Sequence, residues 1–177
     1  MRKPCQKPQG QPIKRCIKTY TKSALTNQFH KNIIRLMDEL LLKIDVQCMD
    51  AETVDGHSKR IVMVPFSGKT EGKYFSGKVV GTGVDTQTFP KDKDGQLIDG
   101  ASTLSARYIL EGKDFSGVDC RIFIENNAGP SGWLPKITTD SNALAYWESA
   151  NLRSSVEAAE NSASEQNRVT VKIFKCN

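Results

Sequence analysis

The chain of 177 residues lacks several features that mark common functional classes. It has no hydrophobic run near the roughly 18–20 residues that a membrane helix needs, so we expect no membrane span. It has two histidines, and none of its five cysteines stands in the CxxC or Cys/His spacing typical of zinc sites. It contains no Asn-x-Ser/Thr sequon and no apolar segment after its basic start, which argues against secretion. These absences predict a cytoplasmic protein with reduced thiols and no bound metal.

Acidic residues are missing from residues 1–36, although that stretch holds nine of the 25 basic residues. The remainder of the chain carries 16 basic and 20 acidic residues, a net charge of −4. A folded domain that neutralises nucleic-acid phosphates usually presents a basic face. We therefore expect no specific nucleic-acid partner for the folded part, and only an unspecific electrostatic attraction from the basic start.

Residues 1–36 are predicted to form a flexible basic arm, because prolines and a glycine stand among lysines and glutamines. Its role stays open among a solvated tail, a targeting segment and sequence upstream of a natural start at Met37. Apolar residues spaced three and four apart within Thr26–Leu42 predict a helix that ends near residues 37–39 and is followed by a strand. Residues 37–177 are predicted to form a single β-barrel domain.

The rest of the sequence is divided by turn dipeptides that end in glycine, such as Asp55-Gly56, Asp94-Gly95 and Glu111-Gly112. Short apolar runs between such turns are typical of antiparallel hairpins. They predict strands at roughly 40–49, 59–67, 74–89, 102–111, 117–126, 133–139, 151–158 and 167–176. Because closure removes exposed edges, we expect an all-β fold in which about eight antiparallel strands form an up-and-down β-barrel. Glycines at 77, 81 and 83 predict a bulge or bend in the third strand.

The hairpin around Glu111-Gly112 and Ser116-Gly117 shows how the side chains alternate. If Glu111 pairs near Gly117, one face collects the apolar side chains. These are Leu104, Ala106, Tyr108, Leu110, Val118, Cys120, Ile122 and Ile124. The other face mixes charged residues with Ile109 and Phe123. Two interpretations are open: the mixed face meets water, as in many antiparallel sheets, or it lines a barrel interior that holds a polar ligand.

Polar residues near strand ends and bends form the candidate ligand-binding set. They are Asp85, Gln87, Arg107, Tyr108, Glu125 and Asn126. Arg107 is interpreted either as half of a structural ion pair or as the anchor for a ligand carboxylate. Asp85 and Glu125 are the candidate catalytic residues, because a buried carboxyl has a raised pKa and can serve as a general base. Tyr108 can donate a hydrogen bond, although its place on the apolar face leaves its hydroxyl to be satisfied.

No nucleotide cofactor is expected. Gly81-Thr82-Gly83 is a fragment of a glycine-rich phosphate-binding motif, but it lies within a strand pattern and no helix follows it. The amide groups of a helix N-terminus, which would receive a phosphate, are therefore missing from the predicted structure.

Two segments of these strands, FSGKVVGTGVDTQ at residues 75–87 and SARYIL at 105–110, resemble stretches of the DUF3237 family, also called UPF0311. IFIEN at 122–126 resembles the following strand of that family. The resemblance extends from about Leu40 to Lys175. It implies an antiparallel β-barrel with a small interior, and it places Asp85, Gln87, Arg107 and Tyr108 at signature positions. The chain has Gly-Thr-Gly where the family has two adjacent glycines, and residues 131–136 differ from the family pattern.

The resemblance implies no particular activity, because the family is largely uncharacterised, and three functions stay open. The first is a binding module that holds a small polar or aromatic acid in the barrel interior, with Arg107 as its anchor. The second is an isomerase or lyase of small-molecule metabolism in which Asp85 or Glu125 moves a proton. The third is a self-associating homo-oligomeric barrel without a ligand. An open interior with an unpaired Arg107 favours the first, a buried carboxylate that lacks a cationic partner favours the second, and an interior filled by side chains favours the third.

Overall fold

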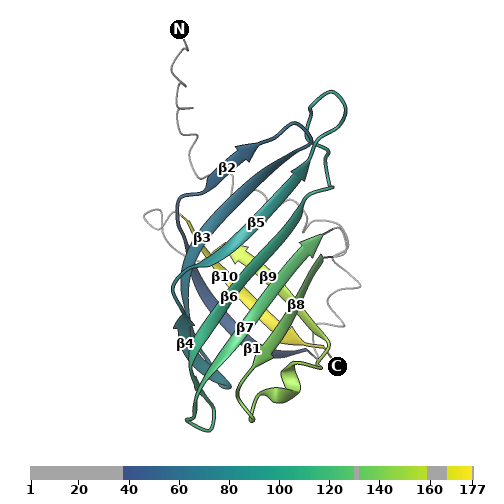
Figure 1. Ribbon diagram of the computed structural model, residues 1–177. Helices are drawn as coiled ribbons and strands as arrows, with labels where there is room; N and C mark the ends of the chain where they lie inside the picture. The colour runs from purple at the N-terminus through teal and green to yellow at the C-terminus, as the bar shows by residue number, and fades with distance from the viewer. Residues whose placement is uncertain (1–37, 130–131, 159–166, 177) are drawn as a thin grey trace.

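The computed structural model describes residues 38–129, 132–158 and 167–176, so the predicted arm and nearly all of the predicted helix lie outside the described residues. The described residues form one antiparallel sheet and one short 3-10 helix, which confirms the predicted all-β class (Figure 1). The strands are β1 (Glu39–Cys48), β2 (Glu52–Asp55), β3 (Lys59–Glu71), β4 (Phe75–Val79), β5 (Gly83–Pro90), β6 (Thr103–Asp114), β7 (Asp119–Gly129), β8 (Gly132–Thr139), β9 (Leu152–Ala158) and β10 (Arg168–Lys175). The 3-10 helix is η2 (Ala145–Trp147).

Each of the eight predicted strand ranges overlaps an observed strand, and the range 74–89 overlaps two. This range breaks between β4 and β5, where Gly81 has a φ of 60°. A left-handed φ of this kind favours glycine, so the predicted bend is confirmed together with its cause. The strand β2 was not predicted from the sequence. All four of its residues are exposed, so the strand has no buried face that could produce an alternating apolar pattern.

The predicted closure of the barrel is wrong, because the hydrogen-bonded sheet does not close. The strand order is β8-β7-β6-β4-β3-β1-β10-β9, while β5 lies beyond β4 between β3 and β6, and β2 pairs with β3. The curl of the sheet brings β8 and β9 alongside each other, but their described residues form no ladder. Pro135 of β8 has no N–H to donate, which suits a strand at the edge of a sheet. The sheet therefore encloses an interior but keeps two edges.

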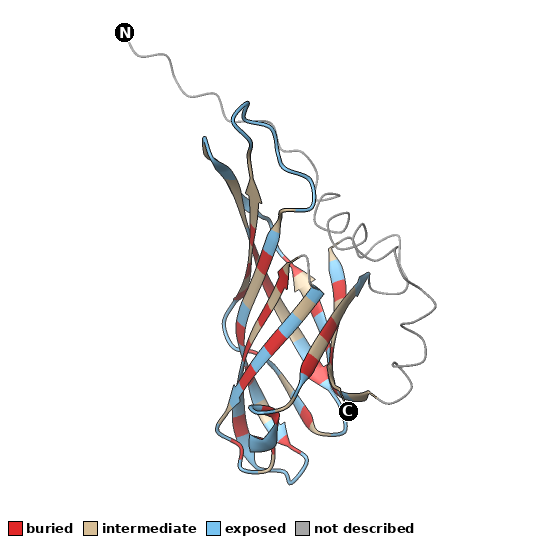
Figure 2. Ribbon diagram, turned by 90° about the vertical axis from the view of Figure 1, so that its right-hand side faces the viewer, coloured by how far each residue is buried: buried red, intermediate tan, exposed pale blue. Residues whose placement is uncertain are grey.

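Side chains alternate between the interior and the surface along the long strands, as the alternating colours in Figure 2 show. On β6 and β7 the predicted apolar face points inward and the mixed face points outward to water. Glu111 pairs with Arg121 instead of pairing near Gly117. The register differs from the prediction by an even number of residues, so the faces are unchanged. Val118 is the exception, because it lies in the turn and is exposed.

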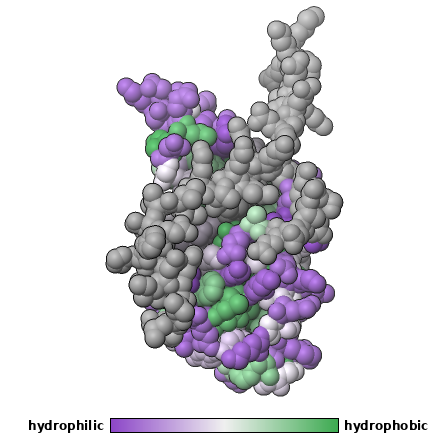
Figure 3. Space-filling model, turned by 180° about the vertical axis from the view of Figure 1, so that it is seen from behind, coloured by the Kyte–Doolittle hydropathy of each residue, from purple (hydrophilic) through white to green (hydrophobic). Residues whose placement is uncertain are grey.

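The face of the described residues that is seen in Figure 3 is mainly polar. Hydrophilic residues cover most of the coloured surface in Figure 3, with smaller hydrophobic areas between them. The described residues include no helix with the length and apolarity needed to cross a membrane. In the described part of the chain, Cys48, Cys120 and Cys176 form no disulfide.

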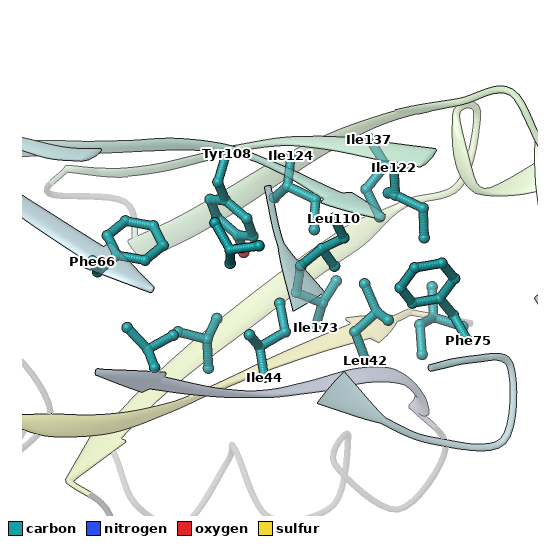
Figure 4. Close-up of a cluster of buried hydrophobic side chains, with 14 of the residues drawn as sticks. Leu42, Ile44, Phe66, Phe75, Tyr108, Leu110, Ile122, Ile124, Ile137 and Ile173 are labelled. Atoms are coloured by element: carbon teal, nitrogen blue, oxygen red, sulfur yellow. The ribbon is translucent and has the colours of Figure 1, made fainter. Parts of the chain in front are cut away.

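The interior is packed with large apolar side chains over much of its length (Figure 4). Its largest fully buried apolar side chains are Trp147, Phe75, Leu42, Ile44, Leu110, Ile122, Ile124, Leu144 and Ile173. Full burial of each aliphatic side chain stabilises the fold by roughly 1.5–3 kcal/mol. Figure 4 shows Phe75 at one end of this cluster and Phe66 with Tyr108 at the other. Trp147 belongs to η2, in the connection from β8 to β9, and its ring contacts Tyr74, the residue before Phe75. The connection therefore supplies a buried side chain near the Phe75 end of the cluster.

Hydrogen bonds to Asp114 connect the turn between β6 and β7 with the segment that follows β8. Its Oδ1 atom accepts hydrogen bonds from the backbone N–H groups of Ser116 at 2.9 Å and Val118 at 3.2 Å. Its Oδ2 atom accepts a hydrogen bond from the Ser141 hydroxyl at 2.6 Å. The hydroxyl groups of Ser116 and Ser141 are the main cause that lowers the pKa of Asp114 to about 2. The charged carboxylate therefore joins two segments that are distant in sequence.

Candidate functional site

A pocket of about 30 Å³ lies inside the curled sheet, toward the end where β7 passes into β8. This volume exceeds the roughly 10–15 Å³ that a cavity needs to hold a water molecule. The pocket is lined by Val46, Cys48, Val64, Phe66, Asp85, Ala106, Tyr108, Asn126, Trp133, Val156, Val169 and Val171. Most of these side chains are apolar, and they come from eight of the ten strands. The pocket is therefore an apolar enclosure with a few polar groups in its lining, which is typical of small-molecule sites.

The register of three strands brings the polar groups of the pocket together. Asp85 of β5 pairs with Ala106 of β6, and Ala106 pairs with Asn126 of β7. Because directly opposite residues point to the same side of a sheet, Asp85 and Asn126 both face the interior on either side of the small alanine. Asp85, Gln87 and Asn126 are each no more than 3% exposed. The structure thus places these three predicted site residues on one inner surface.

Hydrogen bonds orient these buried groups. The Gln87 side chain lies two residues along β5 from Asp85, and its Nε2 atom donates to Asp85 Oδ2 at 2.8 Å. On the other side, the hydroxyl of Ser154 on β9 donates to Asn126 Oδ1 at 2.7 Å. Ser154 is 8% exposed and was not predicted as a site residue, because a single serine in a strand has no distinguishing pattern. Its bond links β7 to β9 across the interior.

Tyr108 is the fourth predicted site residue that faces the interior. Its ring stands edge-on to Phe66, with 5.3 Å between the ring centroids and an angle of 75° between the planes. Gly83 makes this packing possible, since a Cβ atom at that position would lie 2.4 Å from Phe66 Cζ. The Tyr108 hydroxyl is buried and has no hydrogen-bond partner among the described residues. Burial raises the pKa of Tyr108, so the hydroxyl stays protonated and can act as a donor at neutral pH.

Arg107 and Glu125 lie on the outer face of the sheet, away from the pocket. Arg107 Nε donates to Glu125 Oε2 at 3.0 Å, and the arginine side chain is 62% exposed. Hydrogen bonds from Asn127 and Arg107 lower the pKa of Glu125, which is opposite to the rise expected for a buried general base. The interpretation that the mixed face lines the interior is therefore wrong. These two residues form the ion pair that was the alternative interpretation of Arg107.

A second charged cluster lies where β2, β3 and β5 extend beyond the rest of the sheet (Figure 1). Asp55 accepts hydrogen bonds from Arg60 Nε at 3.2 Å and Nη2 at 2.9 Å, and Lys91 Nζ lies 2.7 Å from Asp55 Oδ1. Both cations lower the pKa of Asp55. The sequence did not reveal this cluster, because it depends on the unpredicted strand β2. Among the described residues, no group of three or more His, Cys, Asp or Glu side chains is placed to hold a metal ion.

The sequence matches no family model and no curated protein. The fold is similar to solved structures that are nearly as long as the described domain. A protein of unknown function from Clostridium acetobutylicum ATCC 824 is 22% identical with a TM-score of 0.61, and the match covers 79% of this chain and 96% of that one. A β-barrel-like protein from Acinetobacter baumannii AYE is 14% identical with a TM-score of 0.54, covering 80% and 96%. An enzyme from Penicillium herquei is 15% identical with a TM-score of 0.50, covering 79% and 95%.

These similarities establish a shared fold of the barrel-like type. At such low identities they say nothing about the ligand or the reaction of this chain. The resemblance to the DUF3237 family stays a prediction, since no family model tests it.

Proposed function

We propose that this protein binds a small molecule in the interior pocket, with the Tyr108 hydroxyl as a donor to the ligand. The observation that carries the proposal is the buried hydroxyl of Tyr108, which no described residue satisfies, on a residue that lines the pocket. A buried hydroxyl without a partner costs roughly 1–3 kcal/mol of stability. A ligand atom that accepts its proton would remove this cost.

The charge of the pocket favours a neutral ligand over the acid expected from the sequence. Among the described residues, those that line the pocket include Asp85 with its carboxyl group but no lysine, arginine or histidine. The expected anchor, Arg107, lies outside the sheet in its ion pair with Glu125. An anion would therefore lose its hydration without gaining a cationic partner. A phenol, alcohol or amide can instead hydrogen-bond with Asp85, Tyr108 and Asn126 while its apolar part contacts the valines.

The size of the pocket sets a further condition. About 30 Å³ accommodates one small polar group but not a whole aromatic ring. A larger ligand must displace apolar side chains around the pocket, and these side chains are mainly valines from β1, β3, β9 and β10. We therefore expect small ligands to bind without change in the sheet and larger ones to require local repacking.

Thermal-shift measurements with matched pairs of compounds test the proposal. Each pair consists of a phenol or alcohol and the carboxylic acid of the same size. We expect the neutral members to raise the melting temperature and the acids to have less effect. Tyr108→Phe should then weaken binding by about two- to tenfold, which corresponds to one neutral hydrogen bond. Arg107→Ala is the control and should bind as the wild type does. A panel without stabilising compounds, or equal affinity of Tyr108→Phe, would refute the proposal.

A second candidate function is proton transfer by Asp85. The supporting observation is a nearly fully buried carboxyl that lines the pocket and is oriented by the Gln87 amide. One of the proteins with a similar fold is described as an enzyme. In an isomerisation, Asp85 would take a proton from one ligand atom and return it to another, with no net change in the enzyme. Mass spectrometry of bound ligands after incubation tests this function: Asp85→Asn should retain binding and lose product formation, whereas binding without any product favours the first proposal.

A further inference from the structure

The outer surface of the β6–β7 hairpin carries three consecutive rows of cross-strand pairs, at the front of the molecule in Figure 1. Ile109 and Phe123 form the central row. An ion pair lies in each of the two flanking rows, Arg107 with Glu125 on one side and Glu111 with Arg121 on the other. We name this surface the β6–β7 face. It consists of Arg107, Ile109, Glu111, Arg121, Phe123 and Glu125.

The charges of the β6–β7 face are arranged with two-fold symmetry. In one row the arginine lies on β6 and the glutamate on β7, and in the other row the order is reversed. A rotation of 180° about an axis through the Ile109–Phe123 pair and perpendicular to the sheet exchanges the two antiparallel strands. This rotation places Arg107 on Arg121 and Glu111 on Glu125. The four charges therefore alternate in sign around an apolar centre.

The apolar centre is exposed. Ile109 is 40% exposed, Phe123 is 39% exposed, and Val80 is also 39% exposed. Val80 adjoins this centre, because its backbone N–H donates to the Ile109 carbonyl at 2.8 Å. Three apolar side chains thus lie side by side on the outer surface, between rows of charged residues. An exposed apolar group with a charged rim is typical of a protein–protein contact.

We infer that the β6–β7 face binds the same face of a second copy of this chain. When two copies meet face to face, the two-fold axis of the dimer lies in the contact plane. If the axis runs along the strands, Arg107 of one copy lies opposite Glu125 of the other, and Arg121 lies opposite Glu111. If it runs across the strands, Arg107 lies opposite Glu111, and Arg121 lies opposite Glu125. Opposite charges meet in both arrangements, and the apolar centres meet each other.

Self-complementarity is the reason for choosing a second copy as the partner. An isologous dimer requires that a surface match itself after a two-fold rotation. A different protein would bind through a surface of its own that complements the β6–β7 face. Such a contact would not require the charges of the β6–β7 face to have two-fold symmetry. Complementary charges also fix orientation and exclude wrong partners. The ion pairs within the chain would form with the arginines on either strand, whereas self-association requires the order that is found.

Sedimentation equilibrium of the full chain over a wide concentration range tests this inference. We expect a reversible dimer, with twice the chain mass of 19.6 kDa, that weakens as salt is added. Ile109→Lys should weaken the dimer by at least about tenfold because it places a charge in the apolar centre of the contact. Arg107→Glu should do the same because the new glutamate lies opposite a glutamate of the other copy, and like-charge juxtaposition across an interface costs several kcal/mol. Lys43→Glu is the matched control: Lys43 is exposed on β1, outside the β6–β7 face, and its reversal should leave the dimer unchanged.

Reversal of all four charges separates the proposed contact from an indirect effect on folding. The variant with R107E, E111R, R121E and E125R restores both ion pairs within the chain and keeps the charge pattern self-complementary with inverted signs. We expect it to dimerise like the wild type, while R107E alone does not. Circular dichroism checks that each variant is folded. A wild-type chain that stays monomeric, a dimer that R107E leaves intact, or a fourfold variant that stays monomeric although folded would overturn the inference.

Discussion

Tyr108→Phe should make the protein more stable while it weakens ligand binding. The substitution removes one oxygen atom and retains the ring, whose edge-on contact with Phe66 has a centroid distance of 5.3 Å. The hydroxyl it removes is buried without a hydrogen-bond partner among the described residues. In most positions the loss of a buried polar group removes a hydrogen bond and destabilises the fold. Here the loss removes a desolvation cost.

The magnitude follows from the cost of burying an unsatisfied hydroxyl. That cost is roughly 1–3 kcal/mol. The adjacent pocket of about 30 Å³ can hold one water molecule, which recovers part of it. We therefore expect a gain of about 1 kcal/mol in the free energy of unfolding. For a protein of this size, such a gain raises the melting temperature by about 2–4 °C.

Urea denaturation and thermal denaturation, both without ligand, measure this gain. Two other tyrosines provide controls. Tyr146 is 43% exposed, so Tyr146→Phe should change the free energy of unfolding by less than about 0.5 kcal/mol. The Tyr74 hydroxyl contacts Glu39 and Lys73, so Tyr74→Phe should destabilise the fold. A Tyr108→Phe variant that is less stable than the wild type would show that the hydroxyl is satisfied within the protein, and would remove the main support for the binding proposal.

Three further predictions concern the packing, the charge network and the outer ion pair. Gly83→Ala should lose about 1–3 kcal/mol in urea denaturation, because its Cβ atom would lie 2.4 Å from the ring of Phe66. Gly129→Ala should be nearly neutral, because its Cβ atom would meet no atom of the described residues within 4 Å. The pKa of Asp114 is lowered from 3.8 to about 2. The stabilisation that its charged form provides is therefore complete above about pH 4 and is lost as the pH falls toward 2. Asp114→Asn should remove this dependence of the free energy of unfolding on pH. Arg107→Ala should shift the melting temperature little, because the arginine is 62% exposed.

The faces of the strands could be predicted from the sequence, because side chains alternate with a period of two. The predicted pairing of Glu111 near Gly117 was wrong, yet Leu110, Ile122 and Ile124 still point inward, since the true register differs by an even number of residues. Asp85 and Gln87 are likewise two residues apart on β5, and both are buried on one face. Periodicity therefore determined which residues lie together, even where the exact partner of each residue was wrong.

The direction in which each face points required an energetic argument that parity does not supply. A curled sheet has one interior, and either face of the β6–β7 hairpin could line it. Burial of Leu110, Ile122 and Ile124 is favourable by roughly 1.5–3 kcal/mol each. Burial of Arg107 with Glu125 would instead cost several kcal/mol of desolvation per ion. The apolar face therefore takes the interior, and the arginine expected to hold a ligand lies outside.

Closure of the barrel could not be predicted from hydrophobic patterns, because it depends on hydrogen bonds between edges. The interior sides of β8 and β9 are mainly apolar whether or not their backbones pair, so the sequence pattern is the same for a closed barrel and for a sheet with two edges. Side-chain contacts cross the interior near these edges. Ser154 of β9 reaches across to Asn126 of β7, and Trp147 packs at the Phe75 end of the interior.

The position of the pocket follows from the sizes of the side chains along β6. Leu110 and Tyr108 are large and buried; Leu110 lies within the apolar cluster, and Tyr108 lies at its Phe66 end. The next inward position is Ala106, whose methyl group leaves space between the polar residues on its two neighbouring strands, Asp85 and Asn126. A larger residue there would fill this space and separate the two groups from any ligand. Ala106 is therefore as much a part of the site as Asp85 and Asn126. Because its side chain has no polar atom, it was not among the site residues predicted from the sequence.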